Sequence, residues 1–177
     1  MNTLNFLPFP IIKTERLVLR QLIITDAEDV YALRTNKDVT KFIDRPPSRS
    51  KGDGLAFVNR ITNSVRDNSV IYWVIALKDN PKLIGSICLW NFSKDHKIAE
   101  VGYELFPEHQ GKGIMSEALI EVLNFGFNFA GFNSIEAFTH KDNLDSKNLL
   151  LKHGFIEDKG RVDVDNANNI IFIKQND

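Results

Sequence analysis

The stretch IAEVGYELFPEHQGKGIMSEAL, from Ile98 to Leu119, passes from an alternating segment through a glycine-rich loop into a helical pattern. Its first part, Ile98–Leu105, predicts a strand, and the apolar spacing from about Ile114 to Ala130 predicts a long helix. Ser134–Thr139 predicts the next strand. Such a connection makes its two strands parallel, and the crossover between them is right-handed. Ligands favour the carboxyl ends of parallel strands in open sheets, and the glycine loop lies at that place.

The rest of the chain predicts an α+β protein of one domain, residues 1–177, without a repeat or an interdomain linker. Alternating segments predict further strands at Glu15–Leu22, Val70–Leu77 and Lys82–Trp90, and a closing hairpin from 155–164 and 169–174. Three more helices are expected: one opened by a capping box at Thr25–Glu28, one carrying Phe57, Val58, Ile61 and Val65 inward, and one ending near His153 before Gly154.

Composition narrows the class of protein. The chain is 43% hydrophobic and 25% charged, typical of a globular domain. A formal net charge of −1 gives no general attraction to nucleic acid or to membranes, so we expect neither as a partner. Cys88 is the single cysteine and the first residues do not resemble a signal peptide, so a cytoplasmic location is expected. The four histidines lack metal-ligand spacing, and we expect no metal site.

The glycine loop has two explanations. Gly111 and Gly113 would let backbone amides approach a phosphate closely at a helix N-terminus, and Lys112 would add a positive charge. Alternatively, the glycines only satisfy the backbone angles of a turn, and spacing alone does not decide between the two. The pattern matches neither the Walker loop nor the dinucleotide fingerprint.

Four motifs in chain order resemble the GNAT superfamily of N-acetyltransferases, and within it the branch that acetylates ribosomal-protein N-termini. Gln110–Met115 is similar to the acyl-CoA signature Q/R-x-x-G-x-G/A, with Met115 in the last position. Thr14–Arg20 resembles the opening strand of that branch, and Ala99–Tyr103 resembles its central strand. Asn143–Ser146 with Lys152–Phe155 resembles its distal N-x-x-S…K-x-G-F block.

The resemblance implies a GNAT fold and acetyl-CoA as co-substrate. The sheet would be mixed and mostly antiparallel, with about seven strands, and Ile98–Leu105 would splay from Ser134–Thr139 to admit the pantetheine arm. Backbone groups of Leu105 would bind that arm, Asn143 would contact it, and the pyrophosphate would rest on the glycine loop. The residues that the resemblance assigns to acetyl-CoA are Leu105, Phe106, Gln110, Gly111, Lys112, Gly113, Ile114, Met115, Ser116, Asn143 and Ser146.

Acetyl transfer to an amine requires a base, and the strand Ile98–Leu105 offers two carboxylates. Alternation places Glu100 and Glu104 on one face of this strand. With the resemblance, Glu100 is the expected base, acting through water, and Glu104 is the second candidate. The alternative is a solvated face on which Glu100 pairs with a lysine. A backbone N–H near Val101–Tyr103 would polarise the thioester carbonyl.

The departing thiolate also needs a proton. Many members of the family place a tyrosine in the distal helix, but Leu150 occupies that position here. Ser146 lies one turn earlier and could reach the sulfur, as proposed for the ribosomal-protein branch. The alternative, given equal weight, is that Ser146 only caps its helix.

The expected function is therefore acetyl-CoA-dependent N-acetylation of a primary amine by a monomer or homodimer. The acceptor could be a protein N-terminus in an open groove, or a polyamine or antibiotic in a closed acidic pocket formed with Asp44. The segment Arg45–Gly54, with Phe42 before it, would line the acceptor pocket or form a flexible loop. A non-catalytic acyl-CoA-binding module remains the competing class, because the distal tyrosine is absent. A nucleotide-binding protein is disfavoured, because no Ser or Thr follows Lys112.

Overall fold

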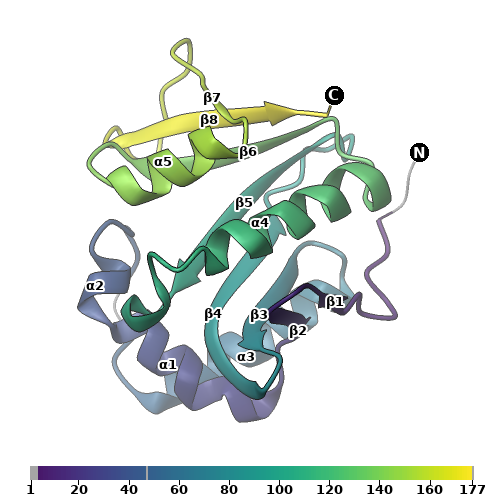
Figure 1. Ribbon diagram of the computed structural model, residues 1–177, viewed down its shortest axis with the longest axis vertical. Coiled ribbons are helices and arrows are strands. Elements are labelled where there is room, and N and C mark those ends of the chain that lie inside the picture. Colours follow the sequence, from purple (N-terminus) through teal and green to yellow (C-terminus); the bar gives the residue numbers. More distant parts are fainter. Residues whose placement is uncertain (1–3, 47, 177) are drawn as a thin grey trace.

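Eight strands form one mixed sheet in residues 4–46 and 48–176, the part of the chain that the computed structural model describes (Figure 1). Their order is β1-β2-β3-β4-β5-β6-β8-β7, and only β5 and β6 are parallel neighbours. The strands are β1 (Ile12–Lys13), β2 (Leu17–Gln21), β3 (Ile71–Leu77), β4 (Asn80–Trp90), β5 (Ile98–Leu105), β6 (Ser134–His140), β7 (Ile156–Glu157) and β8 (Asn169–Gln175). The predicted fold class is confirmed. The expected seven strands are one too few, because β1 is too short for alternation to reveal it.

Five α-helices flank the sheet in the same residues: α1 (Ala27–Thr35), α2 (Lys37–Thr40), α3 (Lys51–Arg66), α4 (Ile114–Asn124) and α5 (Leu144–Lys152). A π-helical turn, Phe125–Phe129, continues α4, so the long helix expected up to Ala130 forms with a change in winding. Gly154 follows α5 with a φ of +78°, as the sequence predicts for a residue that ends a helix.

The capping box expected at Thr25–Glu28 does not form. A short 3-10 turn, Ile24–Asp26, precedes α1, and no side chain caps the first turn of that helix. The Asp26 carboxylate instead accepts hydrogen bonds from the Arg20 guanidinium at 2.8 and 2.7 Å and from the Ile23 N–H at 2.9 Å. Asp26 is only 4% exposed, and a buried carboxylate left without its charged partner costs more than a missing helix cap.

The two faces of the sheet differ in what covers them. Tyr72 of β3 contacts Phe57 of α3, with ring centroids 5.7 Å apart. Its neighbour Trp73 contacts Phe125 at the end of α4, with centroids 5.1 Å apart. Side chains alternate along a strand, and those of directly paired residues lie on the same face of the sheet. The register of β3, β4 and β5 therefore shows which residues of β5 share the face of Tyr72 and which share that of Trp73. Glu100, Gly102 and Glu104 lie on the face covered by α1 and α3, called the α3 face, and Tyr103 and Leu105 lie on the opposite α4 face.

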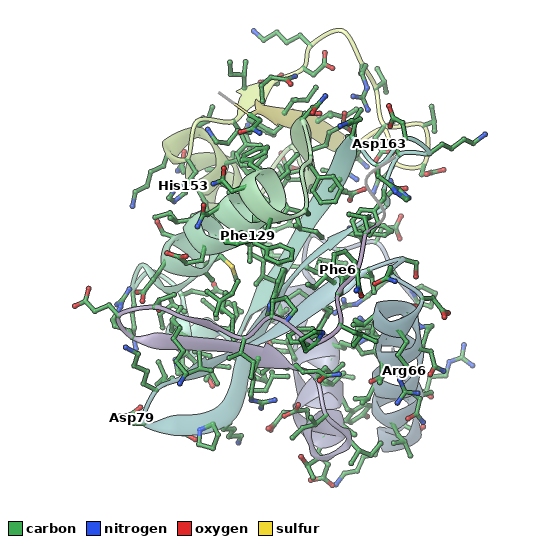
Figure 2. The ribbon with its side chains drawn as sticks, turned by 90° about the vertical axis from the view of Figure 1, so that its right-hand side faces the viewer. Phe6, Arg66, Asp79, Phe129, His153 and Asp163 are labelled. Atoms are coloured by element: carbon green, nitrogen blue, oxygen red, sulfur yellow. The ribbon has the colours of Figure 1, made fainter. Side chains whose placement is uncertain are left out.

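The segment before β1 completes the core on the α4 face. Phe6 is 2% exposed, and its ring centroid lies 6.4 Å from that of Phe125 and 6.0 Å from that of Phe92 (Figure 2). The Trp73 indole N–H donates to the Pro10 carbonyl at 2.8 Å. The N-terminal segment therefore holds the C-terminal end of α4 against the sheet and fixes the axis of that helix.

Strands β5 and β6 separate after three residues. Ile98–Glu100 pairs with Ser134–Glu136, and the pairing of the two strands ends there. Each strand then follows its other neighbour, β5 with β4 as far as Leu105 and β6 with β8 as far as His140. The predicted splay is confirmed. It leaves backbone N–H and C=O groups of both strands facing one another across a gap, and α4 passes in front of β4 and β5 beside it (Figure 1).

Candidate functional site

The glycine loop leads from the carboxyl end of β5 into α4. Gly111 and Gly113 both have left-handed φ values, +70° and +76°, which side chains rarely adopt. Gly113 is the N-cap residue of α4, and no side chain caps this end. The N–H of Glu117 bonds to the Gly113 carbonyl at 3.0 Å, so the N–H groups of Ile114–Ser116 have no partner within the helix. The turn geometry explains why glycines are needed, and the free amides can hold an anion.

Arg16 braces this loop, a role that sequence reasoning missed. Its guanidinium donates to the Lys112 carbonyl at 2.9 Å and to the Glu117 carboxylate at 2.6 Å. Glu117 also accepts from the Thr14 hydroxyl and from the Arg16 N–H. Burial alone would raise the pKa of Glu117, but these hydrogen bonds and the Arg16 charge hold it below its usual value. Arg16 therefore holds the backbone of Lys112 in place, while its charge is paired with that of Glu117.

Two side chains expected at the co-substrate stabilise the site internally. Gln110 donates its amide N–H to the Leu105 carbonyl at 2.8 Å and closes the loop onto β5. The Ser116 hydroxyl lies 2.7 Å from Nε2 of His153, which joins α4 to the end of α5. Burial lowers the pKa of His153, so the ring is neutral at pH 7. The backbone N–H of Ser116 stays available at the helix end, but its hydroxyl is already bonded to His153.

The remaining residues assigned to acetyl-CoA belong to three different elements. The Phe106 N–H is bonded to the Ile84 carbonyl at 3.0 Å, so it belongs to the sheet. Ile114 and Met115 are the first residues of α4 and their side chains are buried, so a ligand at this helix end would meet their backbone N–H groups. Asn143 begins α5, and its side-chain oxygen accepts from the Ser146 N–H at 3.2 Å.

Ser146 is bonded to a tyrosine that comes from β5 rather than from α5. Its hydroxyl lies 2.8 Å from that of Tyr103. Burial raises the pKa of Tyr103 to about 12, although the bond to Ser146 lowers it somewhat, so the phenol is protonated at pH 7. The idea that Ser146 caps α5 is wrong, because Asn143 is the capping residue. Leu150 is fully buried and belongs to the core.

Glu100 lies at the apex of the splay, as the last β5 residue paired with β6. Its carboxylate accepts one hydrogen bond, at 3.1 Å, from the amide of Asn91, which has a left-handed φ of +51°. Burial, with the negative charges of Asp163 and Glu136, raises the pKa of Glu100 to about 7, and the Asn91 bond opposes this shift. The expected alternative, a lysine partner, does not form among the described residues.

Glu104 is a weaker candidate base. It lies on the same face as Glu100, but it forms an ion pair with Arg45, and both side chains are largely buried. The Arg45 guanidinium occupies this carboxylate, so Glu104 is less free than Glu100 to contact an acceptor amine or a bound water. Cys88 lies on this face as well. Burial raises the pKa of its thiol to about 12, so the thiol stays protonated. Neither group competes with Glu100.

The segment between α2 and α3 covers the open end of the α3 face. Phe42 stacks on His140 at the end of β6 with ring centroids 5.4 Å apart, and Arg45 reaches Glu104 near the end of β5. The expected flexible loop Arg45–Gly54 is partly helical, because α3 begins at Lys51. Asp44 is exposed and does not join the acidic groups of β5. This segment therefore spans the separated ends of β5 and β6.

Within residues 4–46 and 48–176, no three histidine, cysteine or acidic side chains gather in a way that could hold a metal ion. Over the same residues, no helix is long and apolar enough to cross a membrane. The groups that the site brings together are one carboxyl with a raised pKa, a hydroxyl pair and free backbone amides.

Comparison with known proteins agrees with this geometry. The family model for the acetyltransferase (GNAT) domain matches residues 16–156. The uncharacterized N-acetyltransferase YoaA of Bacillus subtilis is 35% identical over 147 residues, 83% of each chain. A spermidine N(1)-acetyltransferase of Vibrio cholerae is 26% identical over 144 residues, 81% of this chain and 80% of the relative. A ribosomal-protein-serine acetyltransferase of Escherichia coli is 36% identical over 78 residues, 42% of each chain.

Solved structures share the fold. An acetyltransferase of the GNAT family from Bacillus anthracis superposes with a TM-score of 0.78 at 23% identity, over 94% of this chain and 98% of that one. A microcin self-immunity acetyltransferase, MccE, solved with acetyl-CoA and AMP, superposes with a TM-score of 0.78 at 20% identity, over 92% of this chain and 93% of that one. By its family match and its relatives, the chain belongs to the GNAT family of N-acetyltransferases and is an acyltransferase, with relatives among the ribosomal-protein acetyltransferases.

Proposed function

We propose that this protein transfers the acetyl group of acetyl-CoA to a primary amine, with Glu100 as the general base. The observation that carries the proposal is the position of Glu100, at the apex of the splay with a pKa of about 7. A base is most effective when its pKa lies near the working pH. The rest of the site then has a place for each part of the co-substrate.

The residues of the glycine loop fit the charge of acetyl-CoA. The free N–H groups of Ile114–Ser116, with Lys112 and Arg16 beside them, would hold the pyrophosphate. The pantetheine arm would extend along the gap beside β5, where the backbone near Leu105 is not paired with β6. This arrangement brings the thioester toward the apex, near the backbone of Val101–Tyr103, and one N–H there would polarise the carbonyl.

The reaction needs proton transfers on both sides of the thioester. Glu100 takes a proton from the acceptor ammonium through water, and the amine nitrogen then attacks the carbonyl carbon. The C–N bond forms and the C–S bond breaks, with the electron pair leaving on sulfur. The Ser146–Tyr103 hydroxyl pair gives a proton to the thiolate. The nitrogen loses its second proton as the amide forms, and that proton replaces, through solvent, the one that the hydroxyl pair has given up. Because Glu100 and Tyr103 lie on opposite faces of β5, the base and the acid approach the same carbonyl from opposite sides.

For the acceptor, we propose an N-terminus of a peptide or protein rather than a polyamine. One relative is a ribosomal-protein-serine acetyltransferase and another is a spermidine N(1)-acetyltransferase, so the relatives alone do not choose. A closed acidic pocket would need Glu104 and Asp44, but Arg45 neutralises Glu104, and Asp44 is exposed. The single cysteine, Cys88, fits a reducing, cytoplasmic compartment for this reaction.

The proposal is tested first by binding and then by turnover. The purified protein is titrated calorimetrically with acetyl-CoA, dephospho-CoA and ATP. Acetyl-CoA should bind with micromolar affinity, and the other two should bind more weakly or not at all. Release of the free thiol is then followed with a panel of peptides and small amines. Acetyl-CoA binding without turnover on any amine would favour a non-catalytic acyl-CoA-binding module. Failure to bind acetyl-CoA would contradict the whole proposal.

A further inference from the structure

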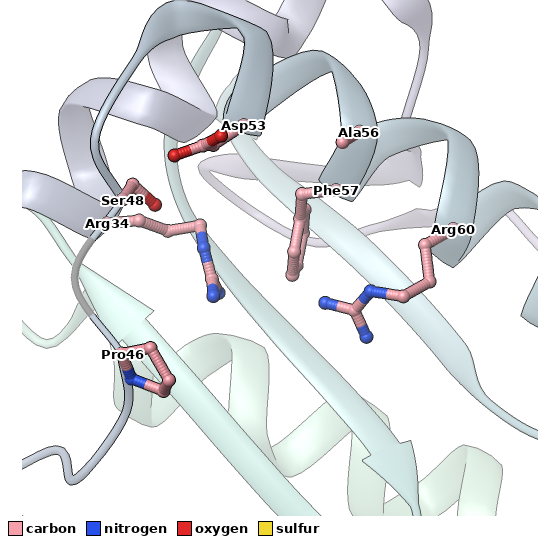
Figure 3. A pocket seen from close by; sticks show the side chains of 7 residues that line it. All are labelled: Arg34, Pro46, Ser48, Asp53, Ala56, Phe57 and Arg60. Carbon is pink, nitrogen blue, oxygen red and sulfur yellow. The ribbon is translucent and has the colours of Figure 1, made fainter.

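A hollow of about 300 Å³ lies beside the reaction site, between α1, α3 and the segment that covers the open end of the α3 face. Its lining residues are Arg34, Pro46, Ser48, Asp53, Ala56, Phe57 and Arg60 (Figure 3). The guanidinium carbons of two arginines lie over the Phe57 ring, that of Arg34 at 4.2 Å and that of Arg60 at 5.0 Å from its centroid. In Figure 3 both guanidinium groups extend into the same space from different helices.

The positive charges around this hollow exceed the carboxylates available to them. Neither Arg34 nor Arg60 forms a salt bridge within the described residues. Arg45 pairs with Glu104 through one nitrogen, while its Nη2 is buried without a hydrogen-bond partner in that part of the chain. Asp53 is committed elsewhere, because it accepts the Arg49 N–H at 2.6 Å and the Ser50 N–H at 3.2 Å at the start of α3.

Burial adds to the cost of this arrangement. Desolvation and the neighbouring Arg45 lower the pKa of Arg34, and Glu104 only partly opposes this. Guanidinium groups remain charged in proteins. Arg34 is partly buried and Arg60 is exposed, and an anion placed between them would accept hydrogen bonds from both. Stacking on Phe57 offers some compensation, but it supplies no hydrogen-bond acceptor for the guanidinium N–H groups.

The hollow is linked to β5 through Glu104, whose charge acts on Arg34 and whose carboxylate is paired with Arg45. Glu104, which receives Arg45, is four residues from Glu100 on the same side of the strand, with Gly102 between them. Gly102 carries no side chain, and the Cys88 thiol and the Trp90 indole N–H flank it from β4. At about 3.3 Å per residue, an amine near Gly102 lies roughly 7–10 Å from an anion held beyond Glu104. Carboxylates lie at the beginning of this path and guanidinium groups at its end.

We propose that the acceptor carries an anionic group, a carboxylate or a phosphate, which Arg34, Arg60 and the free Nη2 of Arg45 bind while its amine faces Glu100. This inference rests on the proposed transferase function and adds its substrate class. The acceptor is then dipolar, with its amine and its anion separated by roughly 7–10 Å. A free α-amino acid is too short, and a polyamine carries the wrong charge at the basic end.

The test uses pairs of acceptors that differ only in the anion. Tri-alanine is compared with tri-alanine amide, because an extended tripeptide separates its amine and carboxylate by about 10 Å. Aminohexyl phosphate is compared with aminohexanol, so that the two pairs distinguish carboxylate from phosphate. The wild-type protein should acetylate the anionic member of at least one pair with a kcat/KM about tenfold higher. In Arg34→Gln and in Arg60→Gln, this ratio should fall to within about twofold of unity.

A matched control and a second measurement keep the two proposals separate. Arg66→Gln removes a charge from the end of α3, outside the hollow, and should keep the preference; an equal loss there would point to long-range charge and overturn the site. Binding of aminohexyl phosphate to the CoA-saturated protein is measured without turnover and should weaken about tenfold in Arg34→Gln. Turnover of both members of each pair at equal rates would overturn the anion site and leave the transferase intact. Arginine-dependent binding of aminohexyl phosphate without turnover of any acceptor would support the anion site and overturn the transferase function.

Discussion

The two faces of β5 are built in different ways. On the α4 face, the proposed acetyl-CoA site uses backbone amides of one loop, which are contiguous in sequence, together with the Tyr103–Ser146 pair. On the α3 face, the proposed acceptor site uses side chains from α1, α3, β5 and the segment before α3. A co-substrate common to a family can be bound by one short motif. An acceptor that differs between family members is bound by side chains from several separate elements, which can change independently.

The largest expected effect on turnover is that of removing Glu100, the proposed base, which acts between the acceptor site and the acetyl-CoA site. In Glu100→Gln, kcat/KM should fall by roughly 10²–10⁴, the usual contribution of a positioned base. The wild-type rate should fall below about pH 7 as Glu100 becomes protonated, and this limb should vanish in the variant. Acetyl-CoA affinity should stay within about twofold in calorimetry, because Glu100 is not part of the glycine loop. A variant with wild-type turnover would remove Glu100 as base.

The same substitution should have the opposite effect on stability. Between its ordinary pKa of 4.5 and about 7, Glu100 holds a proton in the folded chain that the unfolded chain has lost. Unfolding therefore releases a proton in this window, and stability falls as the pH rises through it. Glu100→Gln should remove this penalty and raise the free energy of unfolding at pH 8 by about 1–3 kcal/mol, since one pKa unit corresponds to about 1.4 kcal/mol. Denaturant titration at pH 5 and pH 8 checks this, and the variant should gain less at pH 5.

The next effect concerns the two glycines of the loop, which serve as controls for one another. Gly111→Ala and Gly113→Ala both place alanine at a left-handed φ, and each should lose about 1–2 kcal/mol of stability. Only Gly113 begins α4, where the free amides lie, so only Gly113→Ala should weaken acetyl-CoA binding about tenfold or more. Equal weakening in both variants, measured by calorimetry, would mean that the loop conformation matters and the approach to the helix end does not.

This difference between the faces also explains what the sequence could predict. The crossover, the splay and the glycine loop follow from local patterns, and Glu100 follows from alternation within one strand. Arg16 lies in the motif Thr14–Arg20, but its bond to Lys112 joins residues 96 positions apart and has no local signature in the sequence. The same holds for Tyr103 with Ser146 and for Arg45 with Glu104. The capping box failed because burial of Asp26 with Arg20 outweighed a local preference.

A smaller effect is expected for the hydroxyl pair. Tyr103→Phe and Ser146→Ala should each lower kcat about tenfold and change KM for acetyl-CoA little, because the pair acts on the departing thiolate rather than on the bound ground state. The double variant should be little worse than either single one, since each removes the same 2.8 Å interaction. Steady-state kinetics of the three variants test this. Additive losses would show that the two hydroxyls act separately and that no relay operates on the α4 face.

The smallest effect tests whether the α4 face also depends on a distant side chain. Arg16→Gln should weaken acetyl-CoA binding only about threefold, because the guanidinium is 46% exposed and its charge is screened by solvent. The loss should shrink further at high salt. Lys13→Gln, which removes an exposed charge from the neighbouring strand β1, should have no effect in the same calorimetric titration. If Arg16→Gln instead matched Gly113→Ala, the co-substrate would depend on a long-range contact as much as on the loop. The contrast between the two faces would then reduce to a difference in ligand chemistry.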